Sequence, residues 1–289
     1  MKRIAPIPGW LALALMLASG SSALAQPAAV EALGEKTKES KPTNDSTSWN
    51  LSAGAVLTTG NTQSLQINAG TNLSLARGIH GFELDGQYVL AIGGDRFTTQ
   101  TAHNLRGRAR YDLFFTPNDA AFAAMALRLD RFAGLEPRIQ GQIGYLRNLF
   151  KLNEGKHRLW LEVGYDLTYD RFDYGLLQLD PAIDPATLPR NQIVHAGRLY
   201  VGYDNHLTST LTYRGGLEAL VNVLALGDVR LNWDNALRAK INGNLQAELK
   251  HTLQLDTQPV QGARRLDTTT TISLIYTLLN EEKKEEKKP

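Results

Sequence analysis

The chain has 289 residues, no cysteine, 21% charged residues and a formal net charge of +2 at pH 7. This near-neutral balance argues against a nucleic-acid partner, and the lack of cysteine excludes a disulfide scaffold, thiolate metal sites and cysteine nucleophiles. The sequence also lacks the HExxH, EF-hand, P-loop and dinucleotide-binding motifs. We therefore expect no cofactor, no metal site and no nucleic-acid partner.

The two ends of the chain differ in composition from the rest. Residues 1–25 combine a basic start, a short apolar run and the small residues Ala23-Leu24-Ala25, which predicts a signal peptide. Residues 26–47 are rich in Ala, Lys, Glu, Ser, Thr and Pro without a period, and we expect a disordered periplasmic segment. Residues 280–289 are expected to form a charged tail, in which the charges of the acidic and basic residues cancel.

Between these ends, residues 48–279 consist of segments in which apolar and polar residues alternate. In NLQAELKHTLQLD, residues 244–256, only His251 interrupts the apolar row. Successive strand residues point to opposite faces, and about 9 to 11 tilted residues cross a bilayer. The alternating segments in chain order are roughly 48–58, 62–76, 79–92, 99–115, 119–132, 137–150, 157–171, 192–206, 208–222, 227–240, 243–256 and 265–279.

The connections between these segments alternate between short and long. A barrel with both termini in the periplasm has its odd-numbered loops outside, where loops are longer. The even connections are compact and include Asn242-Gly243, expected as a type I′ turn. The longest odd connection, about residues 172–191, holds three X-Pro pairs that are expected to prevent regular structure. The pattern predicts an all-β fold, a transmembrane up-and-down antiparallel β-barrel of about 12 strands.

The apolar rows are expected to face lipid and the charged rows the lumen. In segment 157–171, Leu161 and Val163 oppose Glu162 and Asp166. Tyr and Trp lie mostly near segment ends, which suits the aromatic girdles of membrane barrels. A soluble sandwich would need shorter strands and would bury the apolar rows in a core.

Several turn and strand motifs are specific enough to compare with known families. They are Trp49 to Leu57, Thr59-Gly60-Asn61-Thr62, Asn235-Ala236-Leu237, Asp256 to Gly262, Arg265-Leu266-Asp267-Thr268 and Ser273-Leu274-Ile275-Tyr276. Together they resemble the YdiY-like family of salt-induced outer-membrane proteins, a domain of unknown function. The resemblance covers about residues 48–279. It implies an outer-membrane barrel and gives no substrate, reaction or active-site residue.

The expected partners follow from this fold. Outer-membrane lipid would surround the barrel, the barrel-assembly machinery would insert it, and ions or small solutes would pass through it. The closing segment differs from common assembly signals, because Ser273 stands in the place of a Gly and Leu278 in the place of the last aromatic residue.

Charged residues of the inward rows form the candidate functional set. The basic members are Arg106, Arg108, Arg110, Arg128, Arg198, Arg214, Arg230, Arg238 and Lys250. The acidic members are Glu83, Asp85, Asp112, Asp130, Glu162, Asp166, Asp170, Asp204, Glu218, Asp234 and Glu248. Their near balance suits pairing across neighbouring strands that braces the barrel. The alternative is a charge-lined constriction that selects solutes.

The sequence leaves three functional hypotheses: a narrow channel for ions or small solutes, a non-conducting structural or stress-related envelope barrel, and an outer-membrane hydrolase. Strand number does not decide, since about 8 strands give a filled interior and 16 to 18 a channel. A hydrolase needs a Ser within reach of a His. The predicted lipid side holds His103, His195 and His251, whereas the lumen side holds Ser64, Ser74 and Ser273. We therefore expect no enzyme and no catalytic residue.

Overall fold

The computed structural model describes residues 45–58, 64–93, 99–152, 156–175, 179, 181, 183–259 and 265–283. The predicted signal peptide and most of the predicted N-terminal segment lie outside the described residues. The strands are β1 (Asp45–Thr58), β2 (Ser64–Arg77), β3 (His80–Gly93), β4 (Thr99–Phe114), β5 (Asp119–Asp130), β6 (Leu135–Leu152), β7 (His157–Phe172), β8 (Asn191–His206), β9 (Leu211–Asn222), β10 (Val229–Lys240), β11 (Leu245–Asp256) and β12 (Leu266–Lys283). Within the described residues, no helix is long and apolar enough to cross a membrane.

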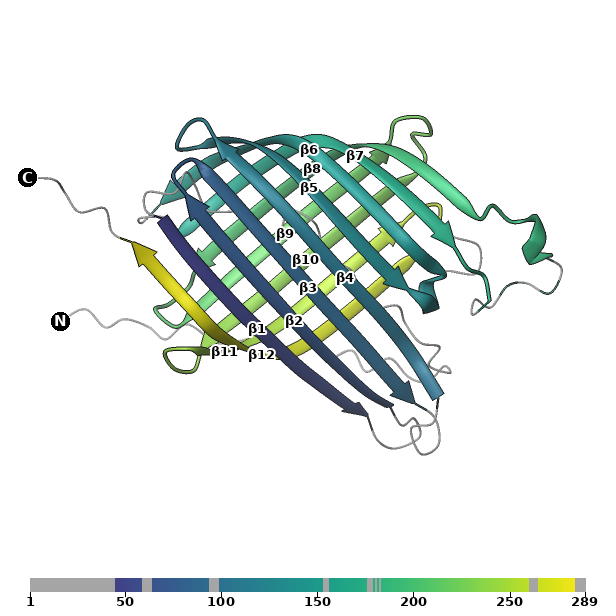
Figure 1. Cartoon of the computed structure of the whole chain (residues 1–289), viewed down its shortest axis with the longest axis horizontal. Helices are drawn as coiled ribbons and strands as arrows, with labels where there is room; N and C mark the ends of the chain where they lie inside the picture. The colour runs from purple at the N-terminus through teal and green to yellow at the C-terminus, as the bar shows by residue number, and fades with distance from the viewer. Residues whose placement is uncertain are drawn as a thin grey trace, which may run out of the picture.

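The strands form a closed barrel in which each one pairs antiparallel with its neighbours in the chain, and β1 pairs with β12 (Figure 1). The predicted up-and-down barrel of about twelve strands is therefore confirmed. The seam between the first and last strands runs from the Asp45–Lys283 pair to the Ala53–Leu274 pair. The first and last strands extend beyond their predicted ends, because β1 includes residues 45–47 and β12 includes residues 280–283. These added residues are polar on both faces, so no alternation marks them.

Side chains alternate between the outer surface and the interior along each strand. On β5, every second residue is buried while the intervening ones face outward. Leu84 and Leu249 are 44% and 47% exposed on the outer surface, so these leucines do not meet in a dry centre. Glu162, by contrast, is fully buried inside. The sequence expectation of apolar residues outside and charged residues inside describes most of the barrel.

Two connections differ from the sequence expectation. Gly243 lacks the positive φ that a type I′ turn requires. The Asn242 side chain shapes this turn instead, because its Oδ1 accepts the backbone N–H groups of Asn244 and Leu245 at 3.1 and 3.0 Å. The long β7–β8 connection is not wholly irregular, since it contains one 3-10 turn, Pro185–Thr187. Proline is compatible with the first position of a helical turn, where its missing N–H is not needed.

The same β7–β8 loop is held by local hydrogen bonds. Asp184 caps the 3-10 turn by accepting the Ala186 N–H at 2.9 Å, and Asp173 accepts the Gly175 N–H at 2.9 Å. The Tyr174 hydroxyl donates to the Pro189 carbonyl at 2.7 Å. Burial raises the pKa of Tyr174, so the phenol stays protonated and remains a donor. Both aspartates therefore have structural roles in the loop.

Candidate functional site

The interior of the barrel is divided into two regions of different side-chain size. One region is packed with large side chains from β4 to β8, namely Phe114, Phe122, Leu146, Trp160 and Tyr200, all buried. The sequence prediction placed apolar residues on the lipid side, and for this cluster it was wrong. Trp160 shows the reason: it stands two positions before the inward Glu162 and therefore shares its face, whatever its polarity. The signal that identifies these inward rings is their position along the strand, an even number of residues from a known inward residue.

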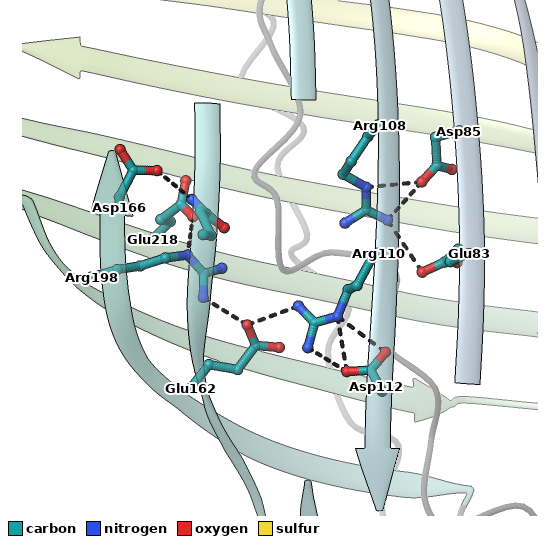
Figure 2. Close-up of polar contacts among 10 residues, drawn as sticks. Glu83, Asp85, Arg108, Arg110, Asp112, Glu162, Asp166, Arg198 and Glu218 are labelled. Atoms are coloured by element: carbon teal, nitrogen blue, oxygen red, sulfur yellow. Dashed lines mark hydrogen bonds and ion pairs between the residues drawn. The ribbon is translucent and has the colours of Figure 1, made fainter. Parts of the chain in front are cut away.

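A chain of ion pairs connects strands β4, β7, β8 and β9 (Figure 2). Two of its members, Arg110 and Arg198, lie over the Phe122 ring of the apolar cluster. Glu162 on β7 accepts from Arg110 on β4 at 3.1 Å and from Arg198 on β8 at 2.7 Å through the same oxygen, Oε2. Arg198 Nε also contacts Glu218 on β9 at 2.6 Å, and Arg110 contacts Asp112 at 2.8 Å. Because β5 and β6 separate β4 from β7 in the sheet, the Arg110–Glu162 pair crosses the lumen instead of joining neighbouring strands.

Aromatic rings support the buried guanidinium groups. The Cζ of Arg110 lies 4.2 Å from the Phe122 ring centroid, and that of Arg158 lies 3.7 Å from the Trp160 ring centroid. Such contacts contribute about 2 kcal/mol or more when they are desolvated. The ion pairs and the rings therefore form one unit, which we call the packed region: Phe114, Phe122, Leu146, Trp160, Tyr200, Arg110, Arg198 and Glu162.

Two glycines make room for the rings of the packed region. A Cβ at Gly202 would lie 2.1 Å from the Trp160 ring, and one at Gly144 would lie 2.7 Å from the Phe122 ring. Real Cβ atoms do not approach other atoms so closely, so a side chain at either position would displace a ring that fills the interior. These positions require glycine for space.

Most of the predicted inward charges are brought together in further pairs. They are Arg108 with Asp85 at 2.6 Å and with Glu83 at 3.2 Å, Arg128 with Asp130 at 2.6 Å, Arg214 with Asp204 at 2.6 Å, Arg230 with Asp256 at 3.3 Å and with Asp170 at 3.8 Å, Arg238 with Glu248 at 2.5 Å, and Lys250 with Asp234 at 4.0 Å. Asp166 instead accepts from Gln142 at 2.7 Å and from Thr168 at 2.6 Å. Several of these pairs join neighbouring strands, namely β3 with β4, β8 with β9 and β10 with β11.

Two inward arginines were missed in the sequence. Arg138 contacts Asp170 at 2.6 Å, and Arg158 contacts Asp204 at 3.4 Å. Arg138 follows a register shift at the start of β6, where the alternation of the strand is disturbed. Arg158 stands at the second position of β7, too close to the turn for a pattern to form, although its parity with Glu162 marks it as inward.

A polar cavity of about 180 Å³ occupies the other region of the interior. Small and neutral polar residues of β12, β1 and β2 form one part of its lining. They include Asn50, Ser52, Asn68, Gly70, Asn72, Thr271 and Ser273. Charged residues from β3, β4, β9, β10 and β11 complete it. They are Glu83, Asp85, Arg106, Arg214, Arg238, Glu248 and Lys250. This space is smaller than the roughly 300 Å³ of pockets for drug-sized ligands.

Three of the residues considered for catalysis, His195, His251 and Ser273, do not share a face of the barrel wall. On the outer face, His195 is hydrogen-bonded to Tyr165, and His251 Nδ1 lies 2.8 Å from the Thr270 hydroxyl. Ser273 is buried inside, and the side chain of Ser64 lies outside the described residues. In the described part of the chain, no three His, Asp or Glu residues are grouped so that they could hold a metal ion.

A closed antiparallel barrel with an apolar outer surface and a charged interior defines a β-barrel of the transmembrane type. The family model "Protein of unknown function, DUF481" matches residues 51–278, and the chain belongs to this family. It is 24% identical over 279 residues to the "Uncharacterized protein YdiY" of Escherichia coli (strain K12), covering 96% of this chain and 100% of that protein. The family resemblance expected from the turn motifs is confirmed.

Solved structures of outer-membrane barrels are similar to this chain at low sequence identity. The COG4313 outer membrane channel from Pseudomonas putida F1 is 11% identical with a TM-score of 0.45, covering 86% of this chain and 100% of that one. The NanC porin is 10% identical with a TM-score of 0.43, covering 80% of this chain and 100% of that one.

The packed region makes a prediction about stability. Glu162→Ala leaves Arg110 and Arg198 buried without their shared carboxylate, and removal of one partner from a buried ion pair costs about 3 to 5 kcal/mol. The matched control is Glu136→Ala, because Glu136 pairs with Arg131 on the exposed surface at 3.8 Å. That change is expected to cost at most about 1 kcal/mol.

The measurement is the urea unfolding free energy of the refolded barrel in detergent micelles. Equal losses for the Glu162→Ala and Glu136→Ala variants would contradict the proposed importance of the buried pairs.

Proposed function

We propose that the barrel spans the outer membrane of a Gram-negative envelope and acts as a narrow passage for ions or small hydrophilic solutes. The apolar outer surface supports the location. Large side chains such as Met125 and Ile143 are about 60% exposed there, on neighbouring strands. A continuous apolar surface of this kind is a liability in water and is stable against lipid. The proposal assigns no catalytic residue.

The outer-membrane location predicts that a charged side chain on the outer face of β6 lowers the free energy of unfolding, and more so the closer it lies to the bilayer midplane. Ile143→Arg, near the middle of this strand, is expected to cost about 2 to 4 kcal/mol, because it would place a charge near the bilayer midplane. Leu152→Arg, at the end of the same strand, is expected to cost about 0 to 1 kcal/mol. Both residues are more than half exposed in the structure. Urea unfolding in lipid vesicles measures the difference, and a larger cost at Leu152 would contradict the proposed membrane position.

The polar cavity is the observation that carries the passage function. The packed region fills the interior beside β4 to β8, so a path for solutes has room along β12, β1 and β2, where Ser52, Gly70 and Ser273 leave space. Amide and hydroxyl groups on this wall can replace water around a passing solute. The path is therefore off the barrel axis and narrow.

Planar-bilayer recording of the refolded full-length protein tests this proposal. A passage is expected to give discrete current steps in potassium chloride. A correctly folded barrel without current steps would contradict it. That outcome would support the alternative, a non-conducting structural barrel of the envelope, which the cross-lumen Arg110–Glu162 pair favours.

The absence of native cysteine allows the path to be mapped with single substitutions. Ser52→Cys places a thiol on the cavity wall, and Ala124→Cys places one on the inward face of β5, where Ala124 is 8% exposed. Ser52→Cys replaces an oxygen atom by sulfur, and Ala124→Cys adds one sulfur atom. A water-soluble cationic methanethiosulfonate reagent is expected to reduce the current through the Ser52→Cys barrel and to leave that through the Ala124→Cys barrel unchanged.

The Ala124→Cys thiol should react with the same reagent after unfolding, which controls for its presence. Block at Ala124→Cys together with no effect at Ser52→Cys would place the path on the other side of the barrel and contradict the proposed route.

A further inference from the structure

The charges around the polar cavity indicate which solutes can use it. We infer that the passage takes small net-neutral hydrophilic solutes, such as polyols, amides and zwitterions, and discriminates little between cations and anions. This inference rests on the proposed passage function and adds the class of solute to it.

The first observation is that charged groups of the cavity wall occur beside groups of opposite sign. Arg108 binds both Asp85 and Glu83, and Arg106 lies on the same strand as Arg108, on the same face. This part of the wall therefore holds Glu83, Asp85 and Arg106, and Arg108, which does not itself line the cavity, pairs with both acidic groups. The potential here falls off quickly with distance, because opposite charges a few ångströms apart act as dipoles.

On β9 to β11, the charged lining residues are Arg214, Arg238, Lys250 and Glu248, and each basic one has an acidic partner, although Asp204 and Asp234 do not themselves line the cavity. Arg238 contacts Glu248 at 2.5 Å and Arg214 contacts Asp204 at 2.6 Å. Lys250 lies 4.0 Å from Asp234. An ion that enters the cavity gives up part of its hydration and finds no excess of opposite charge to compensate for the loss.

The second observation concerns the uncharged part of the cavity wall, on β1, β2 and β12. Asn50 pairs with Asn72 and Ser52 with Gly70 in the β1–β2 register, and this places amides, a hydroxyl and a glycine side by side on the inward face. Ser273 of β12 continues this face and accepts a hydrogen bond from Asn68 Nδ2 at 3.0 Å. Amides and hydroxyls both donate and accept hydrogen bonds, so they match the hydroxyl, amide and amine groups of a neutral solute.

The third observation is size. A cavity of about 180 Å³ is too small for an oligosaccharide or a drug-sized molecule. Glycerol, urea and glycine are suitable probes, because they are net neutral and small.

Two measurements on the full-length protein test the inference. In a potassium chloride gradient across a planar bilayer, the cation-to-anion permeability ratio is expected to lie within about twofold of one. Asp85→Asn is expected to move the ratio toward anions, because Arg106 and Arg108 then face one acidic group, Glu83. Arg238→Gln is expected to move the ratio toward cations, because it removes one positive charge beside Glu248. Glu136→Gln on the exposed surface is the control and should leave the ratio unchanged.

Liposome swelling gives the second readout. Proteoliposomes are expected to swell faster in glycerol, urea and glycine than in sodium acetate or ethanolammonium chloride, and Ser52→Trp is expected to slow swelling in all five. Heat-modifiable migration on gels shows whether each variant is folded.

The outcomes separate this inference from the proposed function. A folded barrel that gives neither current nor swelling would contradict both the proposed passage function and this inference. Current with a ratio of about tenfold or more in favour of either ion, or swelling confined to charged solutes, would overturn the inference while the passage remains.

Discussion

The closed ladder of backbone hydrogen bonds is the constraint on which the rest of the structure depends. A membrane-spanning sheet cannot leave an edge, because unpaired backbone groups in hydrocarbon cost several kcal/mol each. Closure of β12 onto β1 satisfies this requirement and fixes the alternation of every strand. Every second side chain must then enter a lumen of limited volume. The chemistry of the interior follows from which of these side chains are large and which are small.

Large and small inward side chains are distributed unevenly around the barrel. Phe122, Trp160 and Tyr200 bring rings to one side, and Arg110 and Arg198 place guanidinium groups beside them. Glu162 bridges both arginines, and Asp112 and Glu218 supply further negative charge, which allows the guanidinium groups to stay buried. The side formed by β12, β1 and β2 contributes serines, asparagines and glycines, and their small volume leaves the polar cavity. The packed region and the polar cavity therefore occupy different arcs of the inner wall, so the proposed passage is compatible with a packed interior on the other side of the barrel.

Local alternation in the sequence was sufficient to predict the fold and most of the inward charges. Strands such as β5 and β7 have a regular period, so their bounds were placed within a residue or two. Three-dimensional features were not accessible in this way. Arg110 and Glu162 are 52 residues apart on strands that are not sheet neighbours, and only the shape of the closed barrel brings them together. Trp160 was missed because its chemistry suggests lipid while its parity dictates the lumen. Gly243 shows that an Asn-Gly pair does not determine a turn type when the Asn side chain caps the next strand.

The position of the seam has a mechanical consequence. Strands β4 to β8 are joined through their backbones and also through the solid interior that they share. The first and last strands meet beside the polar cavity, where the backbone ladder has an irregularity between Trp49 and Asn50. Interior side chains there are small, so the junction that closes the cylinder relies on its backbone ladder and on polar contacts such as the 2.9 Å hydrogen bond that the Thr277 hydroxyl donates to Asn50 Oδ1.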